Sequence, residues 1–509
     1  MQNGIIILDF GSQYNQLIAR RVRDFGVYSE VVPFNTPLEE VLSKKPVGII
    51  LSGGPSSVNA EDAHLIDKNF FEAGIPILGI CYGMQLTTHL LGGKVKKGVK
   101  GEYGKANLEI VKSNEVLSGI SRNSTVWMSH FDEVEIVPEG FEISGKSDVI
   151  AAMADEKRNV YAFQFHPEVS HTEEGAKMLE NFVFNVCKAE KNWKLTNYID
   201  KTIAEIREKV GSNKVILGLS GGVDSSVAAV LIHKAIGDQL NCIFVDTGLL
   251  RKDEGKKVME NYGEHFHMNI KMIDAADRFL SKLNGISDPE QKRKIIGNEF
   301  VAVFDEESKK FDDAKFLAQG TIYPDVIESQ SVKGPSAVIK SHHNVGGLPE
   351  DMKLELLEPL RELFKDEVRR VGEELGIPHH LVYRHPFPGP GLGIRILGEV
   401  DDEKVKILQE ADDIFIEELY KNDLYEKVSQ AFVVLLPVKS VGVMGDERTY
   451  EYTACVRSAN TIDFMTATWS RLPYEFLELV SNRIINEVKG INRVVYDISS
   501  KPPATIEWE

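Results

Sequence analysis

The sequence lacks closely spaced cysteines, an excess of basic residues and long apolar runs. Its four cysteines are Cys81, Cys187, Cys242 and Cys455. Their wide spacing excludes a CxxC metal motif and a readable disulfide framework, so a reducing cytoplasm fits best. The formal net charge of −18 repels polyanions and argues against nucleic-acid binding. Since no run of about 18 apolar residues and no signal-peptide pattern occurs, we expect neither a membrane span nor export.

The length and composition indicate several globular domains. At about 150 residues per domain, 509 residues predict roughly three or four domains. The apolar share of 42% and the charged share of 27% are those of an ordinary folded chain. More than one functional site is therefore expected.

Two successive regions show the pattern of open α/β domains with mainly parallel sheets. In the first, residues 1–192, β-branched runs at 5–8, 47–51, 75–80 and 161–165 predict buried strands. In the second, residues 193–384, strands are expected at 215–219 and 242–245 around a helix at about 227–235. Near its end a helix is expected to begin at Pro359.

The third region, residues 385–509, begins where HPFPGPGLG breaks regular structure. Its β-rich runs VVLLPV and RVVYDI flank a helical segment. We expect a small α+β domain there.

A cysteine in the first region stands in a nucleophile-elbow pattern. Cys81 follows an apolar strand and lies between Gly79 and Gly83, as a sharp strand-to-helix turn requires. His166 and Glu168 follow another predicted strand. Because parallel strands end at the same edge of a sheet, His166 can meet Cys81 and Glu168 can orient the imidazole.

Each of these elements by itself has a structural reading: GxCxG as a tight turn with a buried small residue, and His-Pro-Glu as a turn. Together they resemble the class I glutamine amidotransferases. The resemblance implies that Cys81 is the nucleophile, His166 the base and acid, and Glu168 the orienting carboxylate. It also implies that the N–H groups of Gly54 and Tyr82 form the oxyanion hole. The other three cysteines are expected to be packed, inert thiols.

A glycine- and serine-rich turn in the second region predicts a phosphate site. It consists of Ser220, Gly221, Gly222, Val223, Asp224, Ser225 and Ser226. Backbone N–H groups and hydroxyls of such a turn can bind phosphate oxygens. The lysine of a Walker A motif is missing, which disfavours γ-phosphoryl transfer. SGGVDSS resembles the loop of the N-type ATP pyrophosphatases, which implies that this loop binds ATP and that Asp224 is a Mg²⁺ ligand.

The whole chain resembles the glutamine-hydrolysing GMP synthetases, in which the two domains are fused before HPFPGPGLGIR and a C-terminal domain. The resemblance implies XMP, ATP and glutamine as substrates, Mg²⁺ as cofactor and a homodimer formed by the C-terminal domain. Further ATP-site residues implied are Asp325, Glu328, Lys340 and Lys365, with a lid around His342 and His343. Lys501 and Glu507 are the implied XMP contacts.

One position departs from the family pattern, and two alternatives stay open. Phe131 stands where the family often has glycine, within the expected glutamine pocket. The first alternative is a synthetase that amidates another acceptor, such as deamido-NAD or aspartate. The second is a nucleotide sensor that keeps the folds without turnover.

Overall fold

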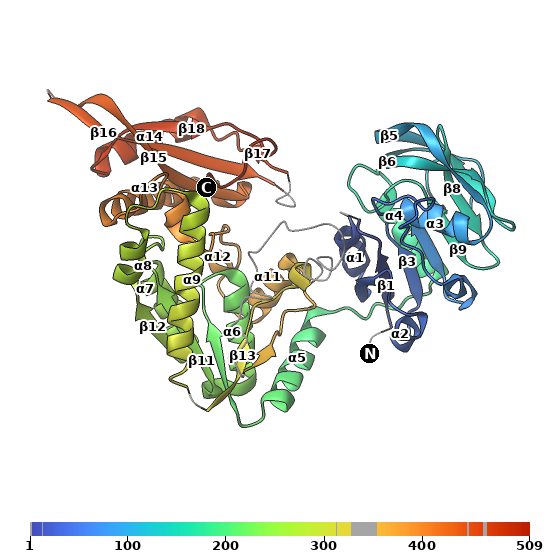
Figure 1. The fold of residues 1–509 in the computed structure, drawn as a ribbon, viewed down its shortest axis with the longest axis horizontal. Coiled ribbons are helices and arrows are strands. Elements are labelled where there is room, and N and C mark those ends of the chain that lie inside the picture. The colour runs from blue at the N-terminus through green and yellow to red at the C-terminus, as the bar shows by residue number, and fades with distance from the viewer. Residues whose placement is uncertain (1–2, 13, 312, 327–353, 445–446, 462–465) are drawn as a thin grey trace. The chain divides into compact units, whose positions relative to one another are not determined.

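Buried parallel strands form the centre of both α/β regions. The computed structural model describes residues 3–12, 14–311, 313–326, 354–444, 447–461 and 466–509. Within the described parts of the chain there are two units, one of residues 3–198 and 324–326 and one of residues 199–323 and 354–509 (Figure 1).

The first unit contains a nine-stranded sheet. Its strands are β1 (Ile5–Asp9), β2 (Ser29–Pro33), β3 (Gly48–Leu51), β4 (Ile77–Ile80), β5 (Lys94–Ile110), β6 (Asn123–Ile136), β7 (Glu142–Lys146), β8 (Ile150–Asp155) and β9 (Val160–Phe163). They are ordered β2-β1-β3-β4-β9-β8-β7-β5-β6, and the five from β2 to β9 are parallel. Strands β3, β4 and β9 are buried throughout, which explains their uninterrupted apolar sequences.

Short helices flank this sheet. They are α1 (Asn15–Asp24), α2 (Leu38–Ser43), α3 (Tyr82–Leu90) and α4 (Gly175–Asn181). Helix α3 packs on β3, β4 and β9, so its first turn lies where these strands end. This arrangement positions the first candidate site.

The second unit contains a five-stranded, wholly parallel sheet. Its order is β12 (Ile270–Asp274), β11 (Leu240–Asp246), β10 (Lys214–Gly218), β13 (Ala314–Ala318) and β14 (Glu355–Leu357). The helices of this region are α5 (Leu195–Val210), α6 (Val223–Ile236), α7 (Glu254–Val258), α8 (Ala276–Leu283), α9 (Pro289–Ser308), α11 (Lys365–Glu374) and α12 (His379–Val382). The predicted α/β class is confirmed for both regions.

The helix expected from Pro359 onward begins later, at Lys365, so that prediction was wrong. The carbonyl of Leu363 accepts a hydrogen bond from the Tyr323 N–H, which engages this backbone outside a helix. The Glu367 carboxylate then accepts the N–H of Phe364 at 2.9 Å and caps the helix start.

The C-terminal region has its own sheet and shares a core with the parallel sheet. It comprises β15 (Gln430–Met444), β16 (Glu447–Asn460), β17 (Thr468–Trp469), β18 (Ile491–Asp497), α13 (Asp402–Lys421) and α14 (Tyr474–Glu487). The pairs β15–β16 and β16–β17 are antiparallel, as the α+β prediction requires. Ile243, Phe279, Leu408 and Val433 belong to one hydrophobic cluster, so both sheets pack into a common core.

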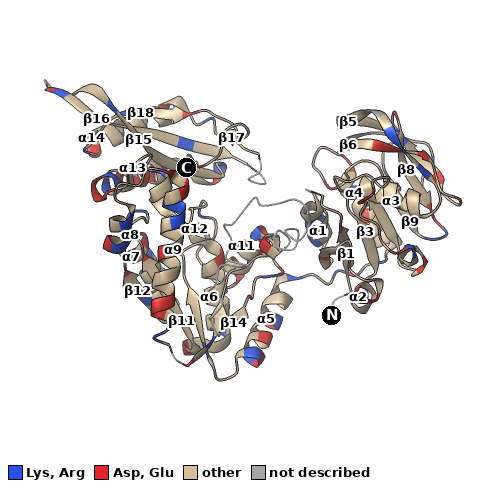
Figure 2. Cartoon of the chain, viewed as in Figure 1, with Lys and Arg blue, Asp and Glu red and all other residues tan. Residues whose placement is uncertain are grey.

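Charged residues of both signs are interspersed along the outer helices, as α9 and α13 illustrate (Figure 2). On α9, for example, Lys294 pairs with Glu290 at the next turn. Such exposed pairs contribute at most about 1 kcal/mol each to the stability of the fold. Their main effect is to keep the surface polar. Among the described residues, every helix is too short or too polar to cross a bilayer.

Candidate active sites

The predicted nucleophile occupies a strained turn between β4 and α3. Cys81 has φ 52° and ψ −104°, a conformation that L-residues rarely adopt. A Cβ atom on Gly79 would lie 2.6 Å from the Gly83 carbonyl oxygen, and one on Gly83 would collide with the Leu51 carbonyl. The two glycines around Cys81 are therefore required by close backbone packing.

His166 and Glu168 lie beside this turn. The imidazole Nδ1 of His166 is 2.8 Å from Oε1 of Glu168, and both side chains are buried. Burial opposes protonation of His166, but the Glu168 charge and a hydrogen bond with Cys81 outweigh it and hold the pKa of His166 well above its usual value. The three groups thus form a connected Cys-His-Glu array in which the imidazole is both held and made more basic.

A cavity of about 360 Å³ opens over this array. Its lining includes Cys81, His166, Gly54, Gln85 and Phe131. Gln85 donates from Nε2 to the Asp132 carbonyl at 2.8 Å, which holds the strand that carries Phe131. Gln85 was missed in the sequence, although its place one turn after Cys81 on a helix could have indicated it.

The predicted oxyanion donors, Gly54 and Tyr82, come from two separate segments of the first unit. Gly54 lines the cavity, and a Cβ there would lie 2.6 Å from the Phe10 carbonyl oxygen, so the position requires glycine. Tyr82 is the first residue of α3, where backbone N–H groups lack helical partners. The Tyr82 hydroxyl is not one of these donors, because it donates a hydrogen bond to the His64 carbonyl at 2.9 Å.

The other cysteines have different surroundings. Burial raises the pKa of the Cys187 thiol, and it raises the pKa of Cys242 and of Cys455 to about 12. Such thiols carry almost no thiolate at neutral pH, so they are poor nucleophiles. Cys187, Cys242 and Cys455 therefore have the surroundings expected of packed, inert thiols.

The predicted phosphate loop joins β10 to the N-terminus of α6. Gly222 precedes the helix, which begins at Val223. Inside the loop, Ser220 Oγ lies 2.9 Å from Ser225 Oγ and accepts the Gly222 N–H at 3.2 Å. Ser226 Oγ is buried and lies within hydrogen-bonding reach of the Tyr262 hydroxyl. Hydroxyls and N–H groups thus gather at a helix N-terminus, as anion binding requires.

Of the further predicted ATP-site residues, Lys365 contacts this loop. The ammonium of Lys365 bonds to Oδ2 of Asp224. Oδ1 of Asp224 is buried without a hydrogen-bond partner among the described residues. Asp325 is partly exposed, while Glu328, Lys340, His342 and His343 lie outside the described residues.

The two predicted XMP contacts lie near the C-terminal end. Glu507 bonds to Arg395 through both carboxylate oxygens, at 2.8 and 3.1 Å, and to Gln430 at 2.7 Å. Arg395 is fully buried and its guanidinium lies 4.1 Å from the Phe432 ring centre. The backbone of Lys501 pairs with Ala467. Arg395 and Gln430 were missed in the sequence because only the fold brings them to Glu507.

Three family models match successive parts of the chain. The class I glutamine amidotransferase model matches residues 6–186, the NAD synthase model residues 195–299, and the GMP synthase C-terminal domain model residues 417–508. The first two segments contain Cys81 and the Ser220–Ser226 loop, respectively.

Curated relatives match over the full length. Proteins named glutamine-hydrolyzing GMP synthase are 70% identical in Fusobacterium nucleatum, 60% in Brachyspira hyodysenteriae and 60% in Spiroplasma kunkelii. Each match covers 100% of this chain and at least 99% of the relative. With this identity over the whole length, the chain belongs to the glutamine-hydrolyzing GMP synthase family.

Proposed function

We propose that this protein converts XMP, ATP, glutamine and water to GMP, AMP, pyrophosphate and glutamate. The observation that carries the proposal is the presence, in one chain, of the Cys81-His166-Glu168 array and the Ser220–Ser226 loop. The first suits release of ammonia from an amide, and the second suits a pyrophosphate leaving group. Full-length similarity to glutamine-hydrolyzing GMP synthases supports joining the two reactions.

In the glutaminase reaction, His166 takes the thiol proton of Cys81, and Sγ attacks the side-chain carbonyl carbon of glutamine. The N–H groups of Gly54 and Tyr82 stabilise the oxyanion. His166 returns the proton to nitrogen as the C–N bond breaks, which releases ammonia and leaves a thioester. Water then hydrolyses the thioester to glutamate, while Glu168 keeps the imidazole in the required orientation.

In the synthetase reaction, the oxygen on C2 of XMP attacks the α-phosphorus of ATP and pyrophosphate leaves. Ammonia then attacks C2 and AMP departs, so the C–O bond breaks as the C–N bond forms. The loop hydroxyls and N–H groups bind the leaving pyrophosphate, and Lys365 adds positive charge beside Asp224. We assign ATP-binding roles also to Asp325, Glu328 and Lys340.

The residues at the loop fit a Mg²⁺ ion. The partnerless oxygen Oδ1 of Asp224 is a hard donor in the first turn of α6. No group of three or more carboxylate, histidine or cysteine ligands occurs in the described parts of the chain, which suits an ion held by one carboxylate together with phosphate and water. When bound, Mg²⁺ would neutralise charge on the departing pyrophosphate.

We assign residues 1–192 to the glutaminase, 193–384 to the ATP pyrophosphatase and 385–509 to dimerisation and XMP binding. Lys501 suits the XMP phosphate, and Glu507, which Arg395 holds in place, suits a ribose hydroxyl or a purine N–H. The four unpaired thiols agree with a cytoplasmic location.

An exposed apolar patch supports a homodimer through the C-terminal sheet. It includes Val438, Val441, Val443 and Tyr450, each at least 58% exposed. Val441 and Tyr450 lie opposite each other on β15 and β16, so the patch is continuous across two strands. Light scattering should give twice the chain mass for the wild type and the monomer mass for Val441→Asp.

Product analysis tests the proposed reaction. With XMP, ATP, Mg²⁺ and glutamine, we expect GMP, AMP and pyrophosphate in equal amounts. Formation of ADP, or ATP cleavage that is equal with and without XMP, would contradict the proposal. Deamido-NAD and aspartate in place of XMP test the other acceptors.

A further inference from the structure

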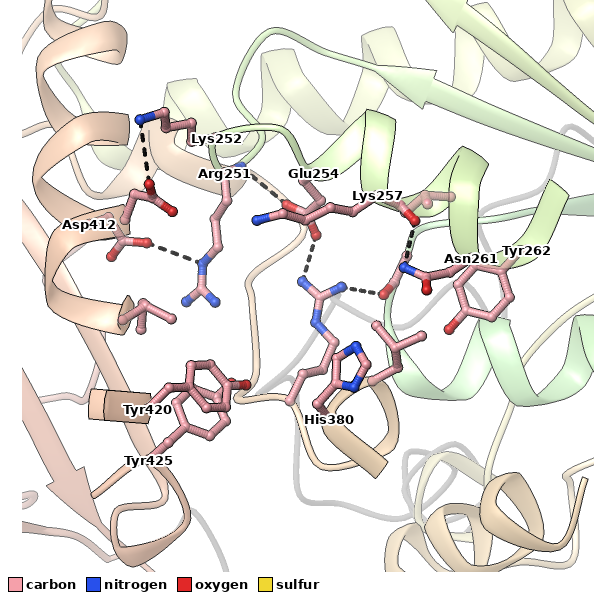
Figure 3. Close-up of a pocket in the computed structure, with 16 residues that line it drawn as sticks. Arg251, Lys252, Glu254, Lys257, Asn261, Tyr262, His380, Asp412, Tyr420 and Tyr425 are labelled. Carbon is pink, nitrogen blue, oxygen red and sulfur yellow. Dashed lines mark hydrogen bonds and ion pairs between the residues drawn. The ribbon is translucent and has the colours of Figure 1, made fainter. Parts of the chain in front are cut away.

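The rear side of the pyrophosphate loop is defined here as the side toward which the Gly221 carbonyl points. Residues that the proposed reaction does not use form hydrogen bonds with the loop on this side. A cavity of about 550 Å³ lies on this side, lined among others by Gly221, Glu254, Tyr262 and Arg384 (Figure 3). All of these residues belong to the second unit. They do not include the Ser220–Ser225 hydroxyl pair inside the loop.

Arg384 connects this rear side to the loop backbone. Its Nη1 donates to the carbonyl of Gly221, and its Nη2 donates to Oε1 of Glu254 at 2.5 Å. The other carboxylate oxygen of Glu254 accepts the Arg251 N–H at 3.1 Å. The guanidinium therefore joins the loop to the first turn of α7 through a continuous set of hydrogen bonds.

The hydrogen bond from Arg384 to the Gly221 carbonyl determines which way the Gly222 N–H points. Gly221 has φ 71°, and a Cβ there would lie 3.3 Å from Val258 and 3.6 Å from Arg384. The carbonyl of Gly221 and the N–H of Gly222 belong to one trans peptide group, so they point in opposite directions. When Arg384 holds the carbonyl toward the rear, the Gly222 N–H faces into the loop, where it donates to Ser220 Oγ.

The guanidinium of Arg384 is held in its charged form. Burial disfavours the charged form of Arg384, but Glu254 outweighs this and raises the pKa of the guanidinium above its usual value. Removing one partner would leave a buried, unpaired charge, which is costly. A lysine cannot replace the arginine, because one ammonium lacks the planar fork that reaches both acceptors.

We propose that Arg384, held by Glu254, is a positioning residue that orients the Gly221–Gly222 peptide for pyrophosphate binding. The proposal rests on the proposed function, because it assigns the loop to the pyrophosphate of ATP. It predicts a selective loss: ATP and pyrophosphate affinity depend on Arg384, whereas XMP affinity does not.

The test uses the full-length protein with ammonium as the nitrogen source, so that the glutaminase is not needed. For Arg384→Met we expect the KM for ATP to rise about 10- to 100-fold and the KM for XMP to change less than about 2-fold. Arg384→Lys should rescue little of this loss. Glu254→Gln, which keeps an acceptor oxygen, should give a smaller rise.

Arg369→Met is the matched control. The Arg369 guanidinium carbon lies 5.4 Å from the centre of the Tyr383 ring. Tyr383 is the residue that precedes Arg384 in the chain. The control variant should leave both KM values unchanged. Equal rises in the KM for ATP and XMP, or full rescue by Arg384→Lys, would overturn the positioning role.

Calorimetry with Mg²⁺ and inorganic pyrophosphate separates this proposal from the proposed function. We expect about 10-fold weaker pyrophosphate binding for Arg384→Met than for the wild type, measured well below the melting temperature of the variant, which the unpaired Glu254 carboxylate should lower. Unchanged pyrophosphate binding would overturn the inference even if GMP synthesis is confirmed. Weaker binding would support it even if the acceptor is not XMP.

Discussion

In the first unit the groups proposed to react already contact one another, whereas the polar groups of the pyrophosphate loop bond among themselves. His166 is held by Glu168 at 2.8 Å, beside a strained Cys81. In the loop, Ser220 Oγ accepts the Gly222 N–H and contacts Ser225 Oγ. Covalent catalysis needs its base and nucleophile in place beforehand, while a phosphate cradle needs donors whose partners can be exchanged for ligand oxygens.

The strongest test of this difference removes the nucleophile. In Cys81→Ala we expect glutamine-dependent synthesis to fall by about 10⁴-fold or more, because no other group can form the thioester. Synthesis with ammonium should remain, because the loop lies in the other unit. GMP formation with each nitrogen source measures this, and Cys455→Ala, a packed thiol, is the control. Equal loss with both sources would mean that the sites are not separate.

Removing the orienting carboxylate tests how far the first site is preorganised. For Glu168→Gln we expect a loss of about 10²- to 10⁴-fold in glutaminase rate, with Glu173→Gln as an exposed control. Because Glu168 helps raise the pKa of His166, that pKa should fall in the variant. A wild-type rate in Glu168→Gln would contradict the assigned role.

The same variant has a predictable effect on stability. A raised folded-state pKa means that protonated His166 stabilises the fold below its ordinary pKa of 6.5 and that this stabilisation is lost as pH rises through the raised value. The melting temperature of the wild type should therefore decline more over that window than that of Glu168→Gln. If the melting temperatures of the two proteins change equally with pH, the His166–Glu168 pair does not contribute to the pH dependence of stability.

The loop is tested by removing the candidate Mg²⁺ ligand. Asp224→Asn should lower synthesis about 10²-fold with glutamine and with ammonium alike, because both nitrogen sources need the activated acceptor. Raising the Mg²⁺ concentration should recover part of the rate. Asp238→Asn, just beyond the other end of α6, should behave as the wild type. A loss confined to glutamine would contradict the assignment.

The smallest expected effect concerns Phe131. This side chain lines the cavity over Cys81, is 40% exposed and lies beneath the Lys97 ammonium, 5.5 Å from its ring centre. In Phe131→Gly we expect the KM for glutamine to rise about 3- to 10-fold with little change in kcat, because binding surface but no reacting group is lost. Ammonium-dependent synthesis should not change. A lower kcat with unchanged KM would mean that Phe131 affects the chemical step.

Much of this molecule could be predicted from local sequence patterns. The buried strands were predicted because parallel strands covered on both faces need continuous apolar runs, and Gly79-x-Cys81-x-Gly83 and SGGVDSS mark turns with few allowed backbone conformations. The start of α11 was misplaced because a distant backbone partner, Tyr323, and a local cap, Glu367, decided it.

The sequence by itself determined the fold class, the candidate nucleophile and the phosphate loop, because each depends on residues that are neighbours in the chain. The tertiary structure alone decided which distant groups support them. Gln85 donates a hydrogen bond to the Asp132 carbonyl, and Arg395 donates to the Glu507 carboxylate. Arg384 donates to the Gly221 carbonyl of the pyrophosphate loop. Such contacts join residues far apart in sequence, and only packing of the strands and helices fixes the short distances on which hydrogen bonds and ion pairs depend.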